Sequence, residues 1–129
     1  MRASIAILLA SFHVLVSADS HDFGACQVRT DGPIDHAATV RVAANCNNNY
    51  IPGPAGWGLS DETAIWARRD SGAGPRFEGL FLQNGDQHTG GIDGDTLHRL
   101  CREAGAGDSS AFSCNRYQIN SDNRVHCVQ

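Results

Sequence analysis

The chain has 129 residues, of which 41% are hydrophobic and 19% are charged, a balance that indicates a globular domain rather than a disordered chain. All ten basic residues are arginine, and fourteen acidic residues outnumber them, so the formal net charge is −4. An acidic chain gains nothing from the phosphate attraction that drives binding to nucleic acids and anionic membranes. We therefore expect no nucleic-acid partner, and we expect the one adjacent basic pair, Arg68-Arg69, to lie on a solvated face.

Residues 1–18 have the features of a secretory signal peptide. Arg2 provides a positive charge, a mostly apolar stretch follows, and Val16-Ser17-Ala18 matches the pattern of a cleavage site. The apolar stretch is too short to cross a membrane as a helix, and no second one follows. We expect a secreted, extracellular protein in which residues 19–129 form a single domain without a membrane span.

The first half of this domain contains two predicted strands and one predicted helix. Residues 26–30 alternate weakly between apolar and polar side chains, and residues 38–44 include three β-branched side chains, so both are expected to be strands. Two prolines and three consecutive asparagines mark residues 45–58 as a loop. A serine suited to an N-cap predicts a helix over residues 60–70, with a strand over residues 63–67 as the alternative.

The second half begins with the most strand-like segment of the chain, residues 76–83. It is followed by Asn84-Gly85, the favoured dipeptide of a two-residue hairpin turn, so residues 86–89 are expected to pair back onto it. A helix is predicted over residues 95–104 and ends at Gly105. One face of this helix carries its apolar residues, Leu97, Leu100, Cys101 and Ala104.

The last predicted element is a hairpin of residues 111–119 and 124–128, with four polar residues between its strands. Together these elements predict an α+β fold in which a small antiparallel sheet is packed by one or two helices. A domain of this size gains substantially from cross-links, so we expect disulfides to stabilise it.

Five cysteines follow the predicted signal peptide, and an odd number leaves at least one thiol without a partner inside the chain. If the turn of the last hairpin is centred on residues 120–121, Cys114 faces Cys127, because positions whose numbers sum to 241 lie opposite one another. We therefore predict a Cys114–Cys127 disulfide.

The remaining cysteines allow two assignments. We favour a Cys46–Cys101 disulfide, which would tie the end of a strand to the second helix. Cys26, near the N-terminus, would then be a free or intermolecular thiol, and it could join two copies of the chain into a homodimer. In the alternative assignment Cys26 pairs inside the fold and Cys46 is free.

Few residues suggest chemistry. No C-x-x-C or H-x₃-H spacing is present, so we expect neither a metal nor another cofactor. Arg76, Glu78 and His88 are the acid–base and phosphate-clamping residue types of small secreted ribonucleases, and residues 88–90 are similar to a phrase of their active sites. In the predicted hairpin, however, His88 faces Phe81 and not Glu78. A solvated face with a local Arg76–Glu78 contact is the favoured interpretation, and catalysis is not expected.

Two aromatic residues in the loop over residues 45–58 are candidates for recognition. Tyr50 and Trp57 lie among prolines and glycines, where an aromatic side chain can anchor a binding partner. Packing inside the core is the alternative for Trp57. Trp66 lies in a more regular segment, and we expect it in the core.

The overall plan of signal peptide, small domain and few cysteines resembles small cysteine-rich proteins secreted by fungi, including host-directed effectors and killer-toxin-like proteins. Residues 26–32 and 101–107 are also similar to segments of the Alternaria major allergen family. That likeness implies an all-β fold and a dimer joined through Cys26. The close middle cysteine pair of that family is absent here, and the predicted helix over residues 95–104 departs from it.

These observations favour an effector-like or toxin-like protein that binds a protein or surface target of a host or competing organism, without catalysis. The alternative is a secreted ribonuclease-like hydrolase that uses Glu78, His88 and Arg76. A passive surface or matrix protein is the third hypothesis.

Overall fold

The computed structural model describes residues 20–86 and 91–129. Its central layer is a four-stranded antiparallel sheet in the order β3 (Tyr50–Pro52), β6 (Leu82–Asn84), β2 (Phe23–Gln27) and β8 (Asp108–Phe112). Along the chain, helix α2 (His36–Ala44) lies between β2 and β3, and helix α3 (Gly94–Glu103) lies between β6 and β8. The order β-α-β-β-α-β is that of a split βαβ motif. The predicted α+β fold class is confirmed.

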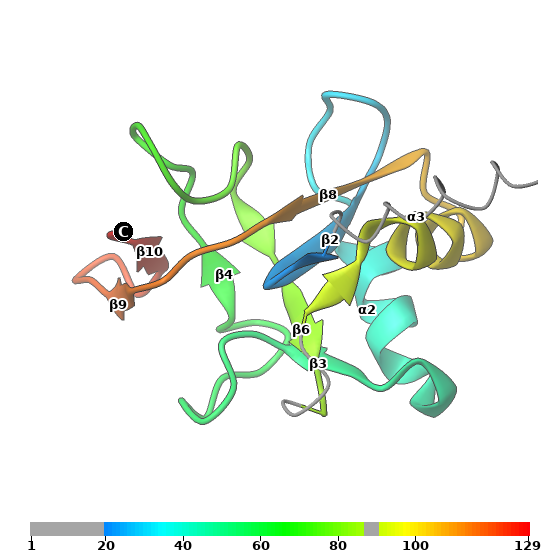
Figure 1. Ribbon diagram of the computed structural model, residues 1–129, viewed down its shortest axis with the longest axis horizontal. Helices are drawn as coiled ribbons and strands as arrows, with labels where there is room; N and C mark the ends of the chain where they lie inside the picture. The colour runs from blue at the N-terminus through cyan, green and yellow to red at the C-terminus, as the bar shows by residue number, and fades with distance from the viewer. Residues whose placement is uncertain (1–19, 87–90) are drawn as a thin grey trace, which may run out of the picture.

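A second sheet covers the face of the central sheet opposite to the helices, so the domain has three layers (Figure 1). Its strands follow the order β5 (Gly79–Leu80), β4 (Ile65–Trp66), β10 (Val125–Cys127) and β9 (Tyr117–Ile119). β10 pairs with β4 in parallel and with β9 in antiparallel orientation. Two shorter elements complete the described residues, a ladder of β1 (Ser20–His21) with β7 (Ile92–Asp93) and a 3₁₀ turn η2 (Cys46–Asn48).

Strand β2 separates two cores, because successive side chains of a strand point to opposite faces. Phe23 and Ala25 belong to the core against the second sheet, whereas Cys26 belongs to the core beneath the helices. Gly24 also lies on the helix side, where a Cβ would be 2.4 Å from the Leu97 side chain, so α3 packs directly on its backbone. The whole strand is buried, since both of its faces are covered.

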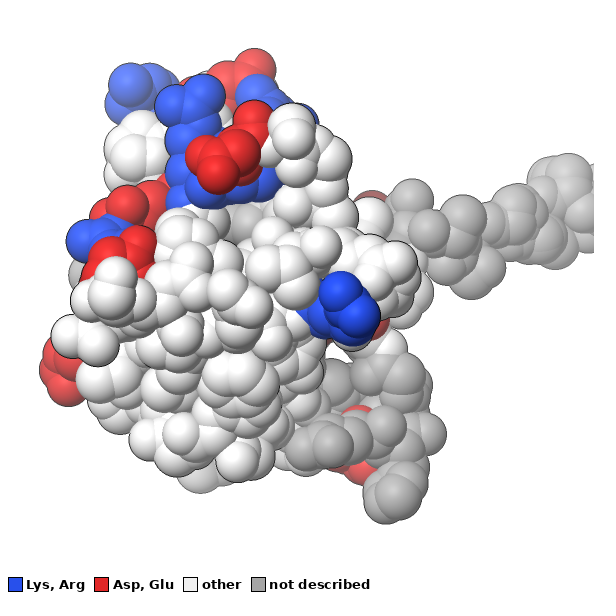
Figure 2. Space-filling view, turned by 90° about the vertical axis from the view of Figure 1, so that its left-hand side faces the viewer, with Lys and Arg blue, Asp and Glu red and all other residues white. Residues whose placement is uncertain are grey.

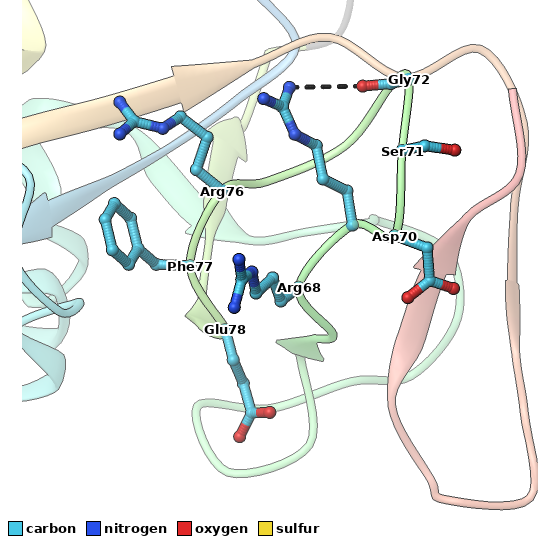
Figure 3. Close-up of a pocket in the computed structure, with 8 residues that line it drawn as sticks. Arg68, Asp70, Ser71, Gly72, Arg76, Phe77 and Glu78 are labelled. Carbon is cyan, nitrogen blue, oxygen red and sulfur yellow. Dashed lines mark hydrogen bonds between the residues drawn. The ribbon is translucent and has the colours of Figure 1, made fainter.

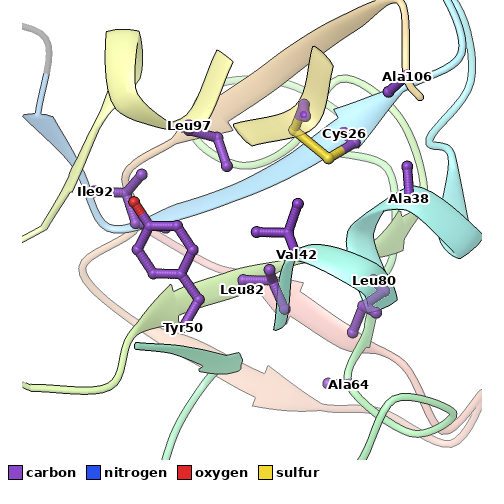
Figure 4. Packing of buried hydrophobic residues seen from close by; sticks show 11 residues of the cluster. Cys26, Ala38, Val42, Tyr50, Ala64, Leu80, Leu82, Ile92, Leu97 and Ala106 are labelled. Atoms are coloured by element: carbon purple, nitrogen blue, oxygen red, sulfur yellow. A yellow bond between two sulfur atoms is a disulfide. The ribbon is translucent and has the colours of Figure 1, made fainter. Parts of the chain in front are cut away.

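The two cores differ in composition. The one beneath the helices is mainly aliphatic and contains a disulfide (Figure 4). The one between the sheets is built from aromatic rings, chiefly Phe23, Trp66, Phe81 and Phe112. Neither helix of the described residues has the length and apolar character needed to cross a membrane.

The strand predicted over residues 38–44 is wrong, because this segment is helix α2. The Asp35 carboxylate accepts a hydrogen bond from the Ala38 N–H at 3.0 Å, and the Thr39 hydroxyl donates to the Asp35 carbonyl at 2.8 Å. An N-cap of this kind, followed by a segment rich in alanine, outweighs the β preference of the branched residues.

The helix favoured over residues 60–70 is also wrong, and the alternative strand is confirmed in β4. The N–H of Ser60 donates to the Thr63 hydroxyl at 2.7 Å, and the N–H of Glu62 donates to the Ser60 hydroxyl at 3.3 Å. These local bonds close a turn instead of starting a helix. Trp66 is then fully buried between the sheets, as expected for a core residue.

The predicted 76–83 strand is divided between the two sheets. β5 pairs with β4 in the second sheet, whereas β6 lies between β3 and β2 in the central sheet. Because both edges of β6 are occupied by distant strands, the hairpin predicted at Asn84-Gly85 does not form on β6. The N–H of Gly85 donates to the Asn49 carbonyl at 2.8 Å instead. Residues 87–90, part of the predicted return strand, lie outside the described residues.

The second helix agrees closely with its prediction. α3 begins one residue earlier than expected, because Asp93 is the N-cap, and its carboxylate accepts a hydrogen bond from the Thr96 N–H at 3.0 Å. Gly105 follows the helix with φ of +96°, a left-handed conformation that glycine adopts without strain. Among the apolar residues of the predicted face, Leu97 and Cys101 are fully buried.

Candidate functional site

An exposed tryptophan stands at the tip of the loop over residues 53–59. The base of this loop is fixed, since the Gly53 N–H donates a hydrogen bond at 2.9 Å to the carbonyl of Phe81, next to β6. Gly56 and Gly58 flank the tryptophan with φ of +86° and +70°, conformations that favour glycine. Trp57 is 42% exposed, although large aromatic side chains are usually well buried.

Trp57 lies on one side of a shallow groove at the edge of the second sheet, with a volume of about 400 Å³. We call this the aromatic groove; its lining residues are Trp57, Asn115, Arg116, Tyr117, Gln118 and Val128. Val128 adds a second exposed apolar side chain to the groove. The groove therefore combines apolar surface with an arginine and two side-chain amides, which can hydrogen-bond to a partner.

A series of ring contacts connects the groove to the aromatic core. The Trp57 and Tyr117 ring centroids are 5.3 Å apart, and Tyr117 in turn lies 5.7 Å from Trp66 and 5.9 Å from Phe23. Such contacts restrict the rotamers of the exposed ring. Trp57 is thus held in place before any partner binds, which reduces the entropy lost on binding.

Tyr50 is not part of this surface, so its prediction as an exposed recognition residue is corrected. It belongs to the core beneath the helices and is 8% exposed. Burial raises the pKa of its hydroxyl, and the nearby Asp93 carboxylate raises it further. The loop prediction failed here because Tyr50 begins strand β3, whose pairing with β6 is not visible in the local sequence.

The cysteines are paired differently from the favoured assignment. Cys26 forms a disulfide with Cys101, with a Cα–Cα distance of 5.3 Å, so the predicted Cys46–Cys101 bond is wrong. The physical reason is that α3 packs on β2, which places Cys101 above Cys26. Cys26 is fully buried and cannot join two chains as a free thiol. Cys46 is exposed in η2 and is the free cysteine, as in the alternative assignment.

The other disulfide joins Cys114 to Cys127, the predicted pair, but the hairpin around it has another register. Cys127 faces Tyr117 and Val125 faces Ile119, so facing positions sum to 244 rather than 241. The turn is longer than expected, since the Asn120 N–H donates to the Arg124 carbonyl at 3.2 Å. Cys114 lies three residues before Tyr117 and outside β9, yet its Cα atom is 6.0 Å from that of Cys127, within the range that a disulfide spans.

Alkylation of the native protein provides a direct test of this thiol assignment. We expect iodoacetamide without reductant to modify Cys46 alone, because Cys46 is exposed and the other four cysteines are disulfide-bonded. Any covalent dimer seen on a non-reducing gel should disappear in the Cys46→Ser variant. Peptide mass mapping reads out the site, with reduced and unfolded protein as the control that labels every cysteine. Label on Cys26 in the native protein would contradict the assignment.

Arg76 and Glu78, two of the three hydrolase candidates, line one cleft of about 690 Å³ (Figure 3). The predicted contact between these two side chains does not form. The Arg76 guanidinium pairs with the Asp31 carboxylate at 2.8 Å, and Glu78 pairs with Arg124. His88 lies outside the described residues. The Arg124 guanidinium favours the charged form of the Glu78 carboxylate, which does not suit a general acid.

Two other histidines contact carboxylates. The His98 Nδ1 atom lies 3.3 Å from the Asp108 carboxylate and 3.5 Å from the Ser109 hydroxyl. A Ser-His-Asp relay needs the serine and the carboxylate on opposite ring nitrogens, so this cluster cannot act as one. His126 pairs with Asp122 at 2.8 Å beside the last turn.

The carboxylates in these pairs are held mainly by the backbone. A hydrogen bond from the Ser109 N–H is the main cause that lowers the pKa of Asp108. The Arg124 N–H does the same for the pKa of Asp122. Because these hydrogen bonds stabilise the charged carboxylates, neither group has the raised pKa typical of a catalytic acid.

Residues 20–86 and 91–129 contain no group of three or more histidine, cysteine, aspartate or glutamate side chains placed to hold a metal ion. Comparison with known proteins found no matching family model, no matching curated protein and no matching solved structure.

Proposed function

We propose that this protein is a secreted, effector-like or toxin-like protein that binds a protein or surface target of a host or competing organism through the aromatic groove. The observation that supports the proposal most directly is the exposed Trp57 ring, held against Tyr117 beside Arg116. Tryptophan, tyrosine and arginine are the residue types most enriched among those that dominate binding energy at protein interfaces.

The construction of the groove also favours binding over catalysis. Its lining offers aromatic area, an arginine and amides, but no histidine or carboxylate that could act as a general acid or base. Exposed aromatic area lowers solubility, so its presence on a surface is an indication of a binding site. The Cys114–Cys127 disulfide cross-links the edge of the sheet beside the groove.

The proposal predicts that Trp57→Ala removes most of the binding while the fold is kept. Fluorescently labelled protein would be incubated with intact yeast cells and with plant protoplasts, and bound fluorescence measured against concentration by flow cytometry. Where the unchanged protein binds saturably, we expect Trp57→Ala to raise the apparent Kd by about 30-fold or more, as for other interface tryptophans.

Val28→Ala is the matched control, because Val28 is an equally exposed apolar residue outside the groove. It should leave the Kd unchanged. Saturable binding that Trp57→Ala does not weaken would contradict the role of the groove, and the absence of saturable binding to either cell type would favour a matrix protein.

The alternative, a ribonuclease-like hydrolase, is supported by one observation and makes a different prediction. Arg76 and Glu78 line the same cleft. If the protein cleaves RNA, Glu78→Gln should abolish cleavage with the fold intact. The binding proposal instead predicts that the unchanged protein has no ribonuclease activity.

A further inference from the structure

A second concave surface lies in the loop between β4 and β5 and is independent of the aromatic groove. Two segments, residues 68–72 and 76–78, run side by side there, and the Arg69 N–H donates to the Pro75 carbonyl at 2.9 Å. We call the hollow of about 690 Å³ between them the arginine cleft; its charged and aromatic lining residues are Arg68, Arg69, Asp70, Arg76, Phe77 and Glu78. The side chains of both segments border one space (Figure 3).

From this surface we infer a further binding site: the arginine cleft binds a phosphate monoester group. Three arginines line one hollow in a protein whose net charge is negative. The planar fork of arginine matches phosphate oxygens with paired hydrogen bonds. A phosphate monoester carries close to two negative charges at neutral pH, so it gains more from several arginines than a single carboxylate does.

The acidic residues near the cleft do not cancel this charge. The Glu78 carboxylate forms an ion pair with Arg124, which is an additional cation beside the cleft. Asp31 pairs with Arg76 at 2.8 Å, but a carboxylate engages only part of the five N–H donors of a guanidinium. Asp70 is exposed and opposes anion binding by its charge.

The three arginines are held to different degrees, which suits a binding surface. The Arg76 guanidinium lies 5.3 Å from the centre of the Phe77 ring, a cation–π contact that fixes its position. Arg69 donates to the Gly72 carbonyl at 3.2 Å and is thereby directed along the loop. Within the part of the chain that the structure describes, the Arg68 side chain has no ion-pair or hydrogen-bond partner, so its donors are free for a ligand.

Charged side chains are unevenly distributed over the face shown in Figure 2. In the space-filling view, arginine and acidic side chains gather at the upper end of the molecule, above a broad uncharged surface (Figure 2). A charged end and an aromatic edge on one domain allow a phosphate group and an apolar partner to be recognised separately.

The test uses the full disulfide-bonded protein, labelled with ¹⁵N, titrated with glycerol 3-phosphate while arginine Nε–Hε and backbone amide resonances are followed. We expect saturable shifts at Arg68 and Arg76 and in the amides of Ser71 and Gly72, with an affinity that falls as NaCl is raised. Glycerol and acetate are the matched ligands without a phosphate group, and neither should produce these shifts.

Arg68→Gln should weaken glycerol 3-phosphate binding by about tenfold or more, since it removes charge-assisted hydrogen bonds. Arg68→Lys, which keeps the charge but loses the fork, should give an intermediate affinity, and Asp70→Asn should strengthen binding. Arg102→Gln is the matched control, because Arg102 is an exposed arginine of α3 away from the cleft.

A phosphate monoester can be presented by a soluble molecule or by a lipid headgroup, and a second arm separates these sources. Phosphatidylcholine vesicles with and without phosphatidic acid are sedimented with the protein. Retention only with phosphatidic acid, lost in Arg68→Gln, assigns the lipid source, whereas saturable shifts without retention assign a soluble one. The inference would be overturned if the shifts did not saturate and no vesicle retained the protein. It would also be overturned if Arg68→Gln and Arg102→Gln lost the same amount of binding.

Discussion

Replacing Trp66 with alanine is expected to lower the free energy of unfolding by about 3–5 kcal/mol, the range for a buried tryptophan. The side chain is 0% exposed between the two sheets. Its ring centroid lies 4.8 Å from that of Phe23 and 4.9 Å from that of Phe112. The truncation would leave a cavity that these rings cannot fill, because both are fixed on paired strands of the central sheet, Phe23 on β2 and Phe112 on β8. It would also remove the bond from the Trp66 indole N–H to the Gly53 carbonyl at 3.2 Å.

Trp57→Ala provides the matched control within the same protein, since Trp57 is 42% exposed. It should lower the free energy of unfolding by less than about 1 kcal/mol. Urea denaturation followed by circular dichroism measures both variants. Equal losses of stability in the two variants would contradict the assignment of one tryptophan to the core and the other to the surface.

Removing the Cys26–Cys101 disulfide in the double variant Cys26→Ala, Cys101→Ala is expected to lower the free energy of unfolding by about 4 kcal/mol. The two cysteines are 75 residues apart, and a cross-link that closes a long loop restricts the unfolded chain most. The bond also joins α3 to the central strand in the core beneath the helices. Because small domains are stable by only about 5–15 kcal/mol, such a loss would bring this one close to unfolding.

The comparison is the double variant Cys114→Ala, Cys127→Ala, whose cysteines are 13 residues apart. Loop closure predicts a smaller loss of about 3 kcal/mol. Thermal and urea denaturation of both double variants show which one loses more free energy of unfolding. If removal of Cys114–Cys127 proved the more damaging change, the long-range disulfide would not be the main covalent support of the fold.

Both candidate binding surfaces lie on loops that connect the core strands. The loop that carries Trp57 connects β3 to β4, and the arginine cleft lies between β4 and β5. Their bases are fixed by Gly53 and by the β4–β5 pairing, whereas Trp57 and Arg68 themselves are exposed. Function can therefore be removed at these positions with little loss of stability, which makes the proposed variants informative.

The candidate site could be predicted only in part. Trp57 is recognisable in the sequence because the glycines on both sides of it disfavour a regular element, whereas Tyr50, without such neighbours, begins β3. Tyr117 and Arg116 were missed, since their neighbourhood with Trp57 depends on how the last hairpin packs. The arginines at positions 68 and 69 were expected on a solvated face. Their cleft forms only because residues 76–78 return beside them.

Features that depend only on neighbouring residues could be predicted from the amino-acid sequence. The helix α3 follows from its apolar face and its terminal glycine, and the Cys114–Cys127 pair was predicted from two cysteines close together across a hairpin, although the register of that hairpin differs. Three other features depend on contacts between segments that are distant in the sequence. Residues 38–44 form a helix, β6 is drawn between two distant strands, and Cys26 lies beneath α3. In each case two local conformations differ little in free energy, and burial against a remote element selects one of them.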